Sequence, residues 1–161
     1  MKSFAPRWVA ACALGELNAR VIVLTGIYHR RGVVDPDDPH FERRPYSMAA
    51  ANAQAQRARV LFASSLAARR PELFVAAVHP GAVRTAALDR APLWPRALAA
   101  TLAAPAFVRP EVGAIPALRL ATMPREGIAS GRFWDRFTLT PDAPTAAERR
   151  AAEALFAARP A

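Results

Sequence analysis

Three histidines are the side chains in this chain best suited to move a proton near neutral pH. They are His29, His40 and His79. His40 lies in an acidic stretch that superficially resembles a metal-binding set, with Asp37, Asp38 and Glu42 around it. The prolines of this stretch oppose a convergent ligand geometry, so we expect a solvated acidic loop and no metal.

Nucleophiles are equally isolated in the sequence. Ser64 and Ser65 fall within a predicted helix, where no nucleophile elbow or Ser–His–Asp arrangement is indicated. Cys12 is the only cysteine and is expected to be a small buried hydrophobe. A single cysteine excludes an internal disulfide and favours a cytoplasmic location.

Alternating strand and helix patterns determine where these residues lie. The run Arg20–Thr25 is continuously apolar and β-branched, as in a strand buried on both faces of a parallel sheet. A helix is predicted from Ser47, a suitable N-cap, to Arg69, and a second strand follows at 73–79. This order is that of a right-handed βαβ unit. Later elements are predicted as short helices within 86–110, a helix over 111–122 kinked at Pro116, a strand at 131–134, and a helix over 144–158 with a Thr145–Glu148 capping box.

Together these elements predict a single α/β domain over residues 1–161. Its sheet has about three parallel strands, near 20–25, 73–79 and 131–134, flanked by helices, and one of its edges is unpaired. A hydrophobic fraction of 53% with 22% charged residues suits a globular chain. The alanine-rich face of the 47–69 helix should allow close approach of a neighbouring backbone.

The net charge of +9 does not indicate a nucleic-acid surface. The arginines are spread along the chain in pairs at most, whereas a nucleic-acid interface usually clusters them with aromatic residues. No apolar run is long enough to span a bilayer, so no membrane partner is expected.

Five segments, taken in order, resemble the second half of the short-chain dehydrogenase/reductase family, closest to its retinol-dehydrogenase-like branch. They are Arg20–His29, Asp37–Tyr46, Val60–Phe62 in the helix that begins near Tyr46, the His-Pro-Gly-Ala-Val-Arg-Thr run at 79–85, and Gly131–Trp134. The resemblance covers about residues 20–157. It implies a partial Rossmann-like fold that lacks the N-terminal nucleotide-binding half. The only spacing close to the family's Gly-x-x-x-Gly-x-Gly turn is Gly127–Gly131, which lacks the third glycine.

The resemblance places the family's catalytic serine, tyrosine and lysine at Gly26, Asn52 and Gln56. None of these can polarise a carbonyl, donate a phenolic proton or lower a neighbour's pKa by its charge. Thr25 has a hydroxyl, but strand alternation would point it to the opposite face from Gly26. A working reductase with an altered acid would need Tyr28 or Tyr46 as the proton donor.

Four positions remain that border the cofactor in the family: Pro80, Gly81, Val83 and Thr85. We interpret them as vestigial, in a turn that shapes the exit of the strand. The family uses NAD(P), but without the phosphate cradle no cofactor is expected for the isolated chain.

The sequence therefore predicts a truncated, catalytically inactive relative of NAD(P)-dependent short-chain dehydrogenases. Two alternatives remain open. The chain could be an interaction protein that forms homo- or hetero-oligomers through the surface of the 47–69 helix. It could also be an oxidoreductase that functions only when a partner chain completes it.

Overall fold

The computed structural model describes residues 19–84 and 107–157. Their elements run in the order β1 (Arg20–Leu24), the 3-10 helix η1 (Ile27–Arg31), α2 (Met48–Arg69), β2 (Phe74–His79), β3 (Ala82–Val83), β4 (Phe107–Val108), α5 (Pro110–Thr122), β5 (Arg132–Asp135), β6 (Thr138–Thr140) and α6 (Ala146–Ala157). The expectations for Cys12, for Thr85 and for short helices within 86–106 lie outside the described residues.

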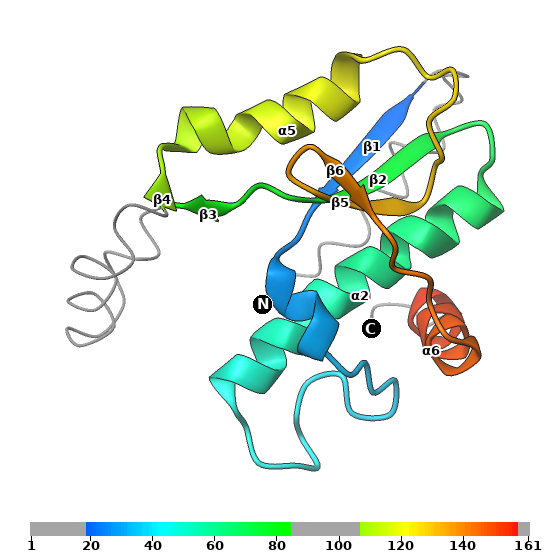
Figure 1. Ribbon diagram of the computed structural model, residues 1–161. Helices are drawn as coiled ribbons and strands as arrows, with labels where there is room; N and C mark the ends of the chain where they lie inside the picture. The colour runs from blue at the N-terminus through cyan, green and yellow to red at the C-terminus, as the bar shows by residue number, and fades with distance from the viewer. Residues whose placement is uncertain (1–18, 85–106, 158–161) are drawn as a thin grey trace.

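The main sheet confirms the predicted α/β, partial Rossmann-like fold. Its strand order is β1-β2-β5-β6, and β1, β2 and β5 are parallel (Figure 1). The crossover between β1 and β2 contains α2, whose N-cap Ser47 accepts a hydrogen bond from the backbone N–H of Ala50. Within the described ranges, no strand pairs with the outer edge of β1, as expected for an unpaired sheet edge.

The fourth strand, β6, was not predicted. It pairs antiparallel with β5 through a two-residue turn formed by Arg136 and Phe137. Arg136 has a φ of +53°, a conformation that glycine or asparagine usually provides in such turns. Because the turn contains neither residue, the sequence carried no hairpin signal.

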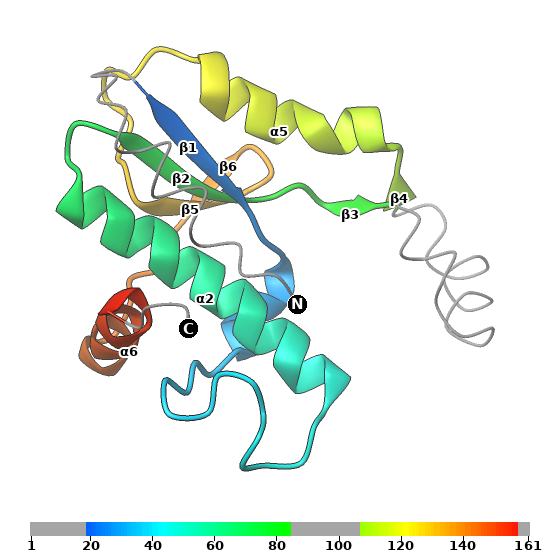
Figure 2. The same cartoon turned by 180° about the vertical axis from the view of Figure 1, so that it is seen from behind.

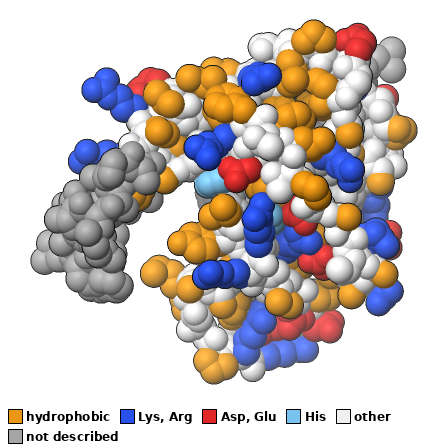
Figure 3. All heavy atoms as spheres, viewed as in Figure 1, with side chains coloured by type: hydrophobic (Ala, Val, Ile, Leu, Met, Phe, Trp, Pro, Cys, Tyr) orange, Lys and Arg blue, Asp and Glu red, His pale blue; other side chains and the backbone are white. Residues whose placement is uncertain are grey.

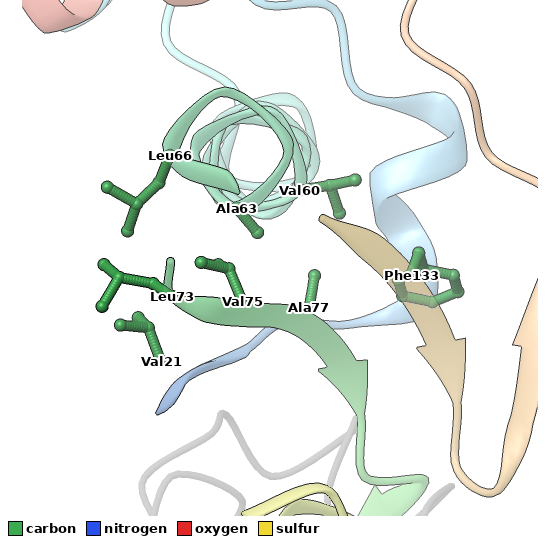
Figure 4. Packing of buried hydrophobic residues seen from close by; sticks show 8 residues of the cluster. All are labelled: Val21, Val60, Ala63, Leu66, Leu73, Val75, Ala77 and Phe133. Atoms are coloured by element: carbon green, nitrogen blue, oxygen red, sulfur yellow. The ribbon is translucent and has the colours of Figure 1, made fainter. Parts of the chain in front are cut away.

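The core lies between the sheet and α2 on one face, and between the sheet and α5 on the other (Figure 2). On the first face, Val60, Ala63 and Leu66 point from α2 toward the strands (Figure 4). Ala63 is fully buried, so this small side chain allows α2 to pack closely against the sheet. On the second face, Leu120 of α5 packs against β2, and its carbonyl accepts a hydrogen bond from Arg20 Nη1.

A second, two-stranded parallel sheet positions the start of α5. β3 pairs with β4, and α5 begins two residues after β4 with Pro110 in its first turn. Val83 of β3 packs directly onto Gly113, where a Cβ atom would collide with the valine side chain. The chain leaving β2 is therefore fastened to the helix that covers the opposite face of the sheet.

Candidate functional site

The parallel strands bring several polar residues together where their carboxyl ends meet; we call this end of the sheet the candidate edge. Thr25 and Gly26 follow β1, His79 ends β2 and Asp135 ends β5. Open α/β sheets bind ligands beyond the carboxyl ends of their strands. This edge, crossed by the middle of α2, is therefore the candidate functional site.

The three positions that the resemblance assigns to catalysis lie together at this edge. Gln56 packs so closely against Gly26 that a Cβ atom on the glycine would lie 2.5 Å from Gln56 Oε1. Gln56 Nε2 donates a hydrogen bond of 3.2 Å to Asn52 Oδ1, one turn earlier on α2. Two amides and a glycine supply no acidic proton and no fixed charge at this point.

Thr25 supplies a hydroxyl beside the Gln56 contact, but that hydroxyl is already used. It is 8% exposed, and its Oγ1 donates a hydrogen bond of 2.9 Å to the backbone oxygen of Gln56. The expectation that Thr25 points away from Gly26 is wrong, because the Thr25 hydroxyl and the place of a Gly26 Cβ atom both meet Gln56. Thr25 itself continues the alternation of Val21 and Val23 toward α2. The hydrogen bond from Thr25 to Gln56 therefore holds α2 against the end of β1.

The two tyrosines lie mainly in solvent. Tyr28 is 55% exposed on η1, and Tyr46 is 71% exposed ahead of α2, with its ring edge against Phe41. None of the hydrogen bonds found among the described residues brings either phenol to Gln56.

His79 and Asp135 form a second polar feature of this edge. They are level with one another in the parallel register of β2 and β5. Burial lowers the pKa of His79, and the negative charge of Asp135 opposes that shift. The Nδ1 atom of His79 is buried and finds no hydrogen-bond partner among the described residues.

The turn after β2 has identifiable packing roles. Gly81 has a φ of +92°, which favours glycine, and the side chain of Arg136 lies beside it. Val83 occupies the space above Gly113. Pro80 and Gly81 border the candidate edge, whereas Thr85 lies outside the described residues.

The described residues do not fit the pyrophosphate of a dinucleotide. Such a group needs a glycine-rich turn leading from a strand into a helix N-terminus. The Gly127–Gly131 spacing leads into strand β5 instead. Ser47 caps the N-terminus of α2. Reciprocal hydrogen bonds between Thr145 and Glu148 cap the N-terminus of α6 and confirm the predicted capping box.

A buried ionic network lies on the face of the sheet that α2 covers, and it was not predicted from the sequence. Arg57 is 7% exposed; its Nη1 donates to Asp142 Oδ1 at 2.7 Å and its Nε to Glu148 Oε1 at 2.6 Å. His29 Nε2 lies 2.8 Å from Asp142 Oδ2, and its Nδ1 lies 2.8 Å from the oxygen of Gly26. The network therefore joins α2, η1 and the segment that enters α6 around one guanidinium.

The electrostatics of this network favour its charged form. Burial opposes the positive charge of Arg57, but hydrogen bonds to Glu148 and Asp142 outweigh that effect and raise its pKa. The hydrogen bonds from Arg57 lower the pKa of Glu148 to about 2, against the opposing effect of burial. A cleft of about 920 Å³ opens beside the network, and Gly26, Asn52 and Gln56 do not line it.

The acidic loop is more ordered than expected. Asp38 is 5% exposed, so the prediction of a solvated loop is wrong at this position. Its Oδ1 accepts hydrogen bonds from the backbone N–H groups of Glu42 and Arg43, and its Oδ2 lies 3.3 Å from Arg44 Nε. Within the part of the chain that the structure describes, no group of acidic, histidine or cysteine side chains is arranged to hold a metal ion.

Gly26→Ala is expected to cost about 1 kcal/mol of unfolding free energy, because the new methyl group displaces the Gln56 amide and breaks its bond to Asn52. In a Gln56→Ala background the same substitution should cost almost nothing. Urea denaturation of the two single variants and the double variant measures this coupling. Additive effects would show that the contact has no energetic role.

Acidification is expected to weaken the fold between about pH 5 and pH 2 through Glu148. The folded-state pKa of Glu148 is lowered, so its contribution is fully present above the ordinary carboxyl pKa and is lost as the pH falls through the folded value. Glu148→Gln should flatten this part of the pH–stability profile. Glu153→Gln, an exposed change on the same helix, is the control and should leave the slope unchanged.

The fold and this edge define a protein of the Rossmann-like α/β class. A crystal structure of an uncharacterised protein from Mycobacterium paratuberculosis matches 87% of this chain with a TM-score of 0.59 and 24% sequence identity. The match covers 48% of that protein. No family model matches the chain.

Two curated proteins are similar in sequence. Human retinol dehydrogenase 13 is 30% identical over 145 residues, which cover 86% of this chain and 44% of that protein. A protein described as a putative daunorubicin C-13 ketoreductase, from Streptomyces sp. (strain C5), is 32% identical over 68 residues, which cover 42% of this chain and 24% of that protein. The chain thus spans less than half the length of each of these three proteins. These similarities support a distant relationship to the short-chain oxidoreductases.

No helix among residues 19–84 and 107–157 combines the length and apolar character needed to cross a bilayer.

Proposed function

We propose that this chain is a non-catalytic relative of the short-chain dehydrogenases/reductases, corresponding to the C-terminal part of its relatives. The observation that carries the proposal is the contact in which the Gln56 amide fills the space against Gly26 and bonds to Asn52. Its single cysteine is consistent with a cytoplasmic location.

Hydride exchange between a nicotinamide and an alcohol or carbonyl requires a proton donor whose pKa is matched to neutral pH. An adjacent cation must lower the pKa of a tyrosine before that tyrosine can act. Asn52 and Gln56 provide neither the proton nor the cation, and the hydroxyl of Thr25 is held by a backbone oxygen. Among the described residues, the positions that the resemblance assigns to the acid and the cation therefore supply neither, and the Thr25 hydroxyl beside them is already bonded.

We propose further that the isolated chain does not retain NAD(P). Pro80, Gly81 and Val83 offer a turn beside the candidate edge but no charge for a phosphate. A pocket wall without the pyrophosphate contacts would bind the dinucleotide poorly.

The test combines binding and turnover. We expect no change in NADH or NADPH fluorescence at millimolar cofactor, and no turnover of retinol with NAD(P)⁺ under conditions in which the human retinol dehydrogenase is active. Saturable cofactor binding with carbonyl reduction by the unmodified chain would overturn the proposal. Tyr28→Phe and Tyr46→Phe would then identify the substitute acid.

A second candidate function is association through α2, either with another copy or with a chain that completes the site. The exposed start of this helix favours it, because Tyr46 and Met48 are 71% and 74% exposed. Asn52, Ala55 and Arg59 continue this side of the helix. Co-purification with a longer homologue, lost on Met48→Glu, would support this function.

A further inference from the structure

The cleft beside the Arg57 network lies between two segments that both pack against α2 (Figure 1). One wall is the chain that leaves η1, from Gly32 to Pro36, and the other wall is a face of α6. Gly32 packs directly against Arg57, and Arg57 in turn donates a hydrogen bond to Glu148 of α6. Because both walls are attached to the same helix, the cleft is formed before any ligand arrives, as small-molecule sites usually are.

Apolar side chains make up most of the lining of this cleft. Val33 lines the first wall and is 74% exposed, which is unusual for a large hydrophobic residue. On the second wall, Ala147, Ala151 and Ala154 lie four and three residues apart, so they follow one face of α6. The volume of about 920 Å³ falls within the range of small-molecule sites, roughly 300–1,000 Å³. Both walls therefore suit the apolar part of a small ligand.

Three arginines and two carboxylates also line the cleft. Arg57 is bonded to both carboxylates, those of Asp142 and Glu148. Arg30 and Arg150 are exposed, one on each wall, and neither forms a salt bridge within the described ranges. In the view of Figure 3, charged side chains of both signs lie among apolar ones over the lower half of the molecule, where η1 and α6 lie. The lining thus has a surplus of one positive charge, and two of its guanidinium groups have no carboxylate partner.

This distribution of charge favours a ligand with a single negative charge. A guanidinium forms strong charge-assisted hydrogen bonds with a carboxylate. A ligand with several negative charges would be repelled by Asp142 and Glu148, whose side chains are 14% and 24% exposed. Glu148 keeps its charge at neutral pH because Arg57 lowers its pKa to about 2.

We propose that this cleft binds a small amphipathic monocarboxylate. Its carboxylate pairs with Arg30 and Arg150, and its apolar body lies against Val33 and the alanine face of α6. None of the three positions that the resemblance assigns to catalysis lines the cleft. The site is therefore separate from the candidate edge, and it does not depend on the proposed lack of catalysis.

Titration of the full chain with octanoate tests the proposal. Isothermal titration calorimetry at neutral pH should show saturable binding of one octanoate per chain. Acetate lacks the apolar body and 1-octanol lacks the charge, so each should bind at least about tenfold more weakly. Backbone amide resonances of Gly32, Val33 and Ala147 should shift on binding, whereas those of Gly26 and Asn52 should not.

Charge reversal separates the cleft from general attraction to a basic chain. Arg30→Glu and Arg150→Glu should each weaken octanoate binding by about tenfold, because repulsion replaces attraction. Arg59→Glu makes the same change on an exposed part of α2 outside the cleft and should leave the affinity unchanged. Circular dichroism checks that every variant is folded.

Four results would overturn the proposal. They are the absence of saturable octanoate binding, equal binding of 1-octanol, unchanged affinity in both cleft variants, and an equal loss of affinity in Arg59→Glu. Amide shifts confined to Gly26 and Asn52 would also overturn it, because they would place the ligand at the candidate edge.

Discussion

Gly32→Ala is expected to destabilise the chain by about 3 kcal/mol, at the upper end of the cost of overpacking. Gly32 is the C-cap of η1 with a φ of −80°, a backbone conformation that any residue can adopt. The obstacle is space, because a Cβ atom would fall well under 3.0 Å from the backbone oxygen of Ala53 and would also press on the Cβ of Arg57. Backbone cannot rotate aside as a side chain can. Urea denaturation and thermal unfolding measure the loss.

Gly127→Ala provides the matched control. Gly127 has a φ of +76°, and no atom lies within 4 Å of the position that a methyl group would take, so only its conformation resists substitution. Its replacement should cost about 1 kcal/mol. If both substitutions cost the same, the close approach of η1 to α2 does not govern stability.

Arg57→Met is expected to cost about 3 kcal/mol, because it leaves two carboxylates facing one another without their cation. The side chains of Asp142 and Glu148 are only 14% and 24% exposed, so water compensates them poorly. Arg59→Met, two residues further along α2 and less buried, should change stability by less than about 0.5 kcal/mol. Denaturation at neutral pH compares the two variants directly.

Removing the carboxylates as well should recover part of this loss. In an Asp142→Asn/Glu148→Gln background, Arg57→Met no longer leaves carboxylates without a cation. The loss of unfolding free energy caused by Arg57→Met should therefore fall substantially. An unchanged cost in that background would mean that the arginine stabilises the chain through its aliphatic stem rather than through the ionic network.

Local patterns were sufficient to predict the parallel part of the fold. The apolar runs at β1 and β2, the Ser47 cap and the Thr145–Glu148 box each act over a few residues, and all four are present. The β5–β6 hairpin escaped prediction because Arg136 adopts a left-handed conformation in place of glycine. The 3-10 helix η1 also lacks a sequence signal of its own.

The assignment of Gly26, Asn52 and Gln56 to the family's catalytic positions stays a prediction, and the contacts around them were not predicted. The resemblance identified Gly26, Asn52 and Gln56, and the structure places them together. Arg57 was missed because its partners lie more than 80 residues away, a separation that periodicity does not detect. One signal was available: Arg57 occupies the same helical face as Ala53 and Val60, where a buried charge requires partners. Asp38 was missed for a different reason: its backbone partners, Glu42 and Arg43, are close in sequence, but they reach its carboxylate only through the irregular path of the loop.

The addition of β6 makes the two edges of the sheet unequal. β6 has three residues, two of them threonine, whereas β1 presents five residues with a β-branched apolar centre. Short polar edges resist pairing with further strands, and longer apolar edges invite it. Within the described residues, strand addition is thus directional: two chains joined along β1 would expose only β6 at both ends. The β5–β6 hairpin is therefore expected to disfavour addition of a further strand at its own edge of the sheet.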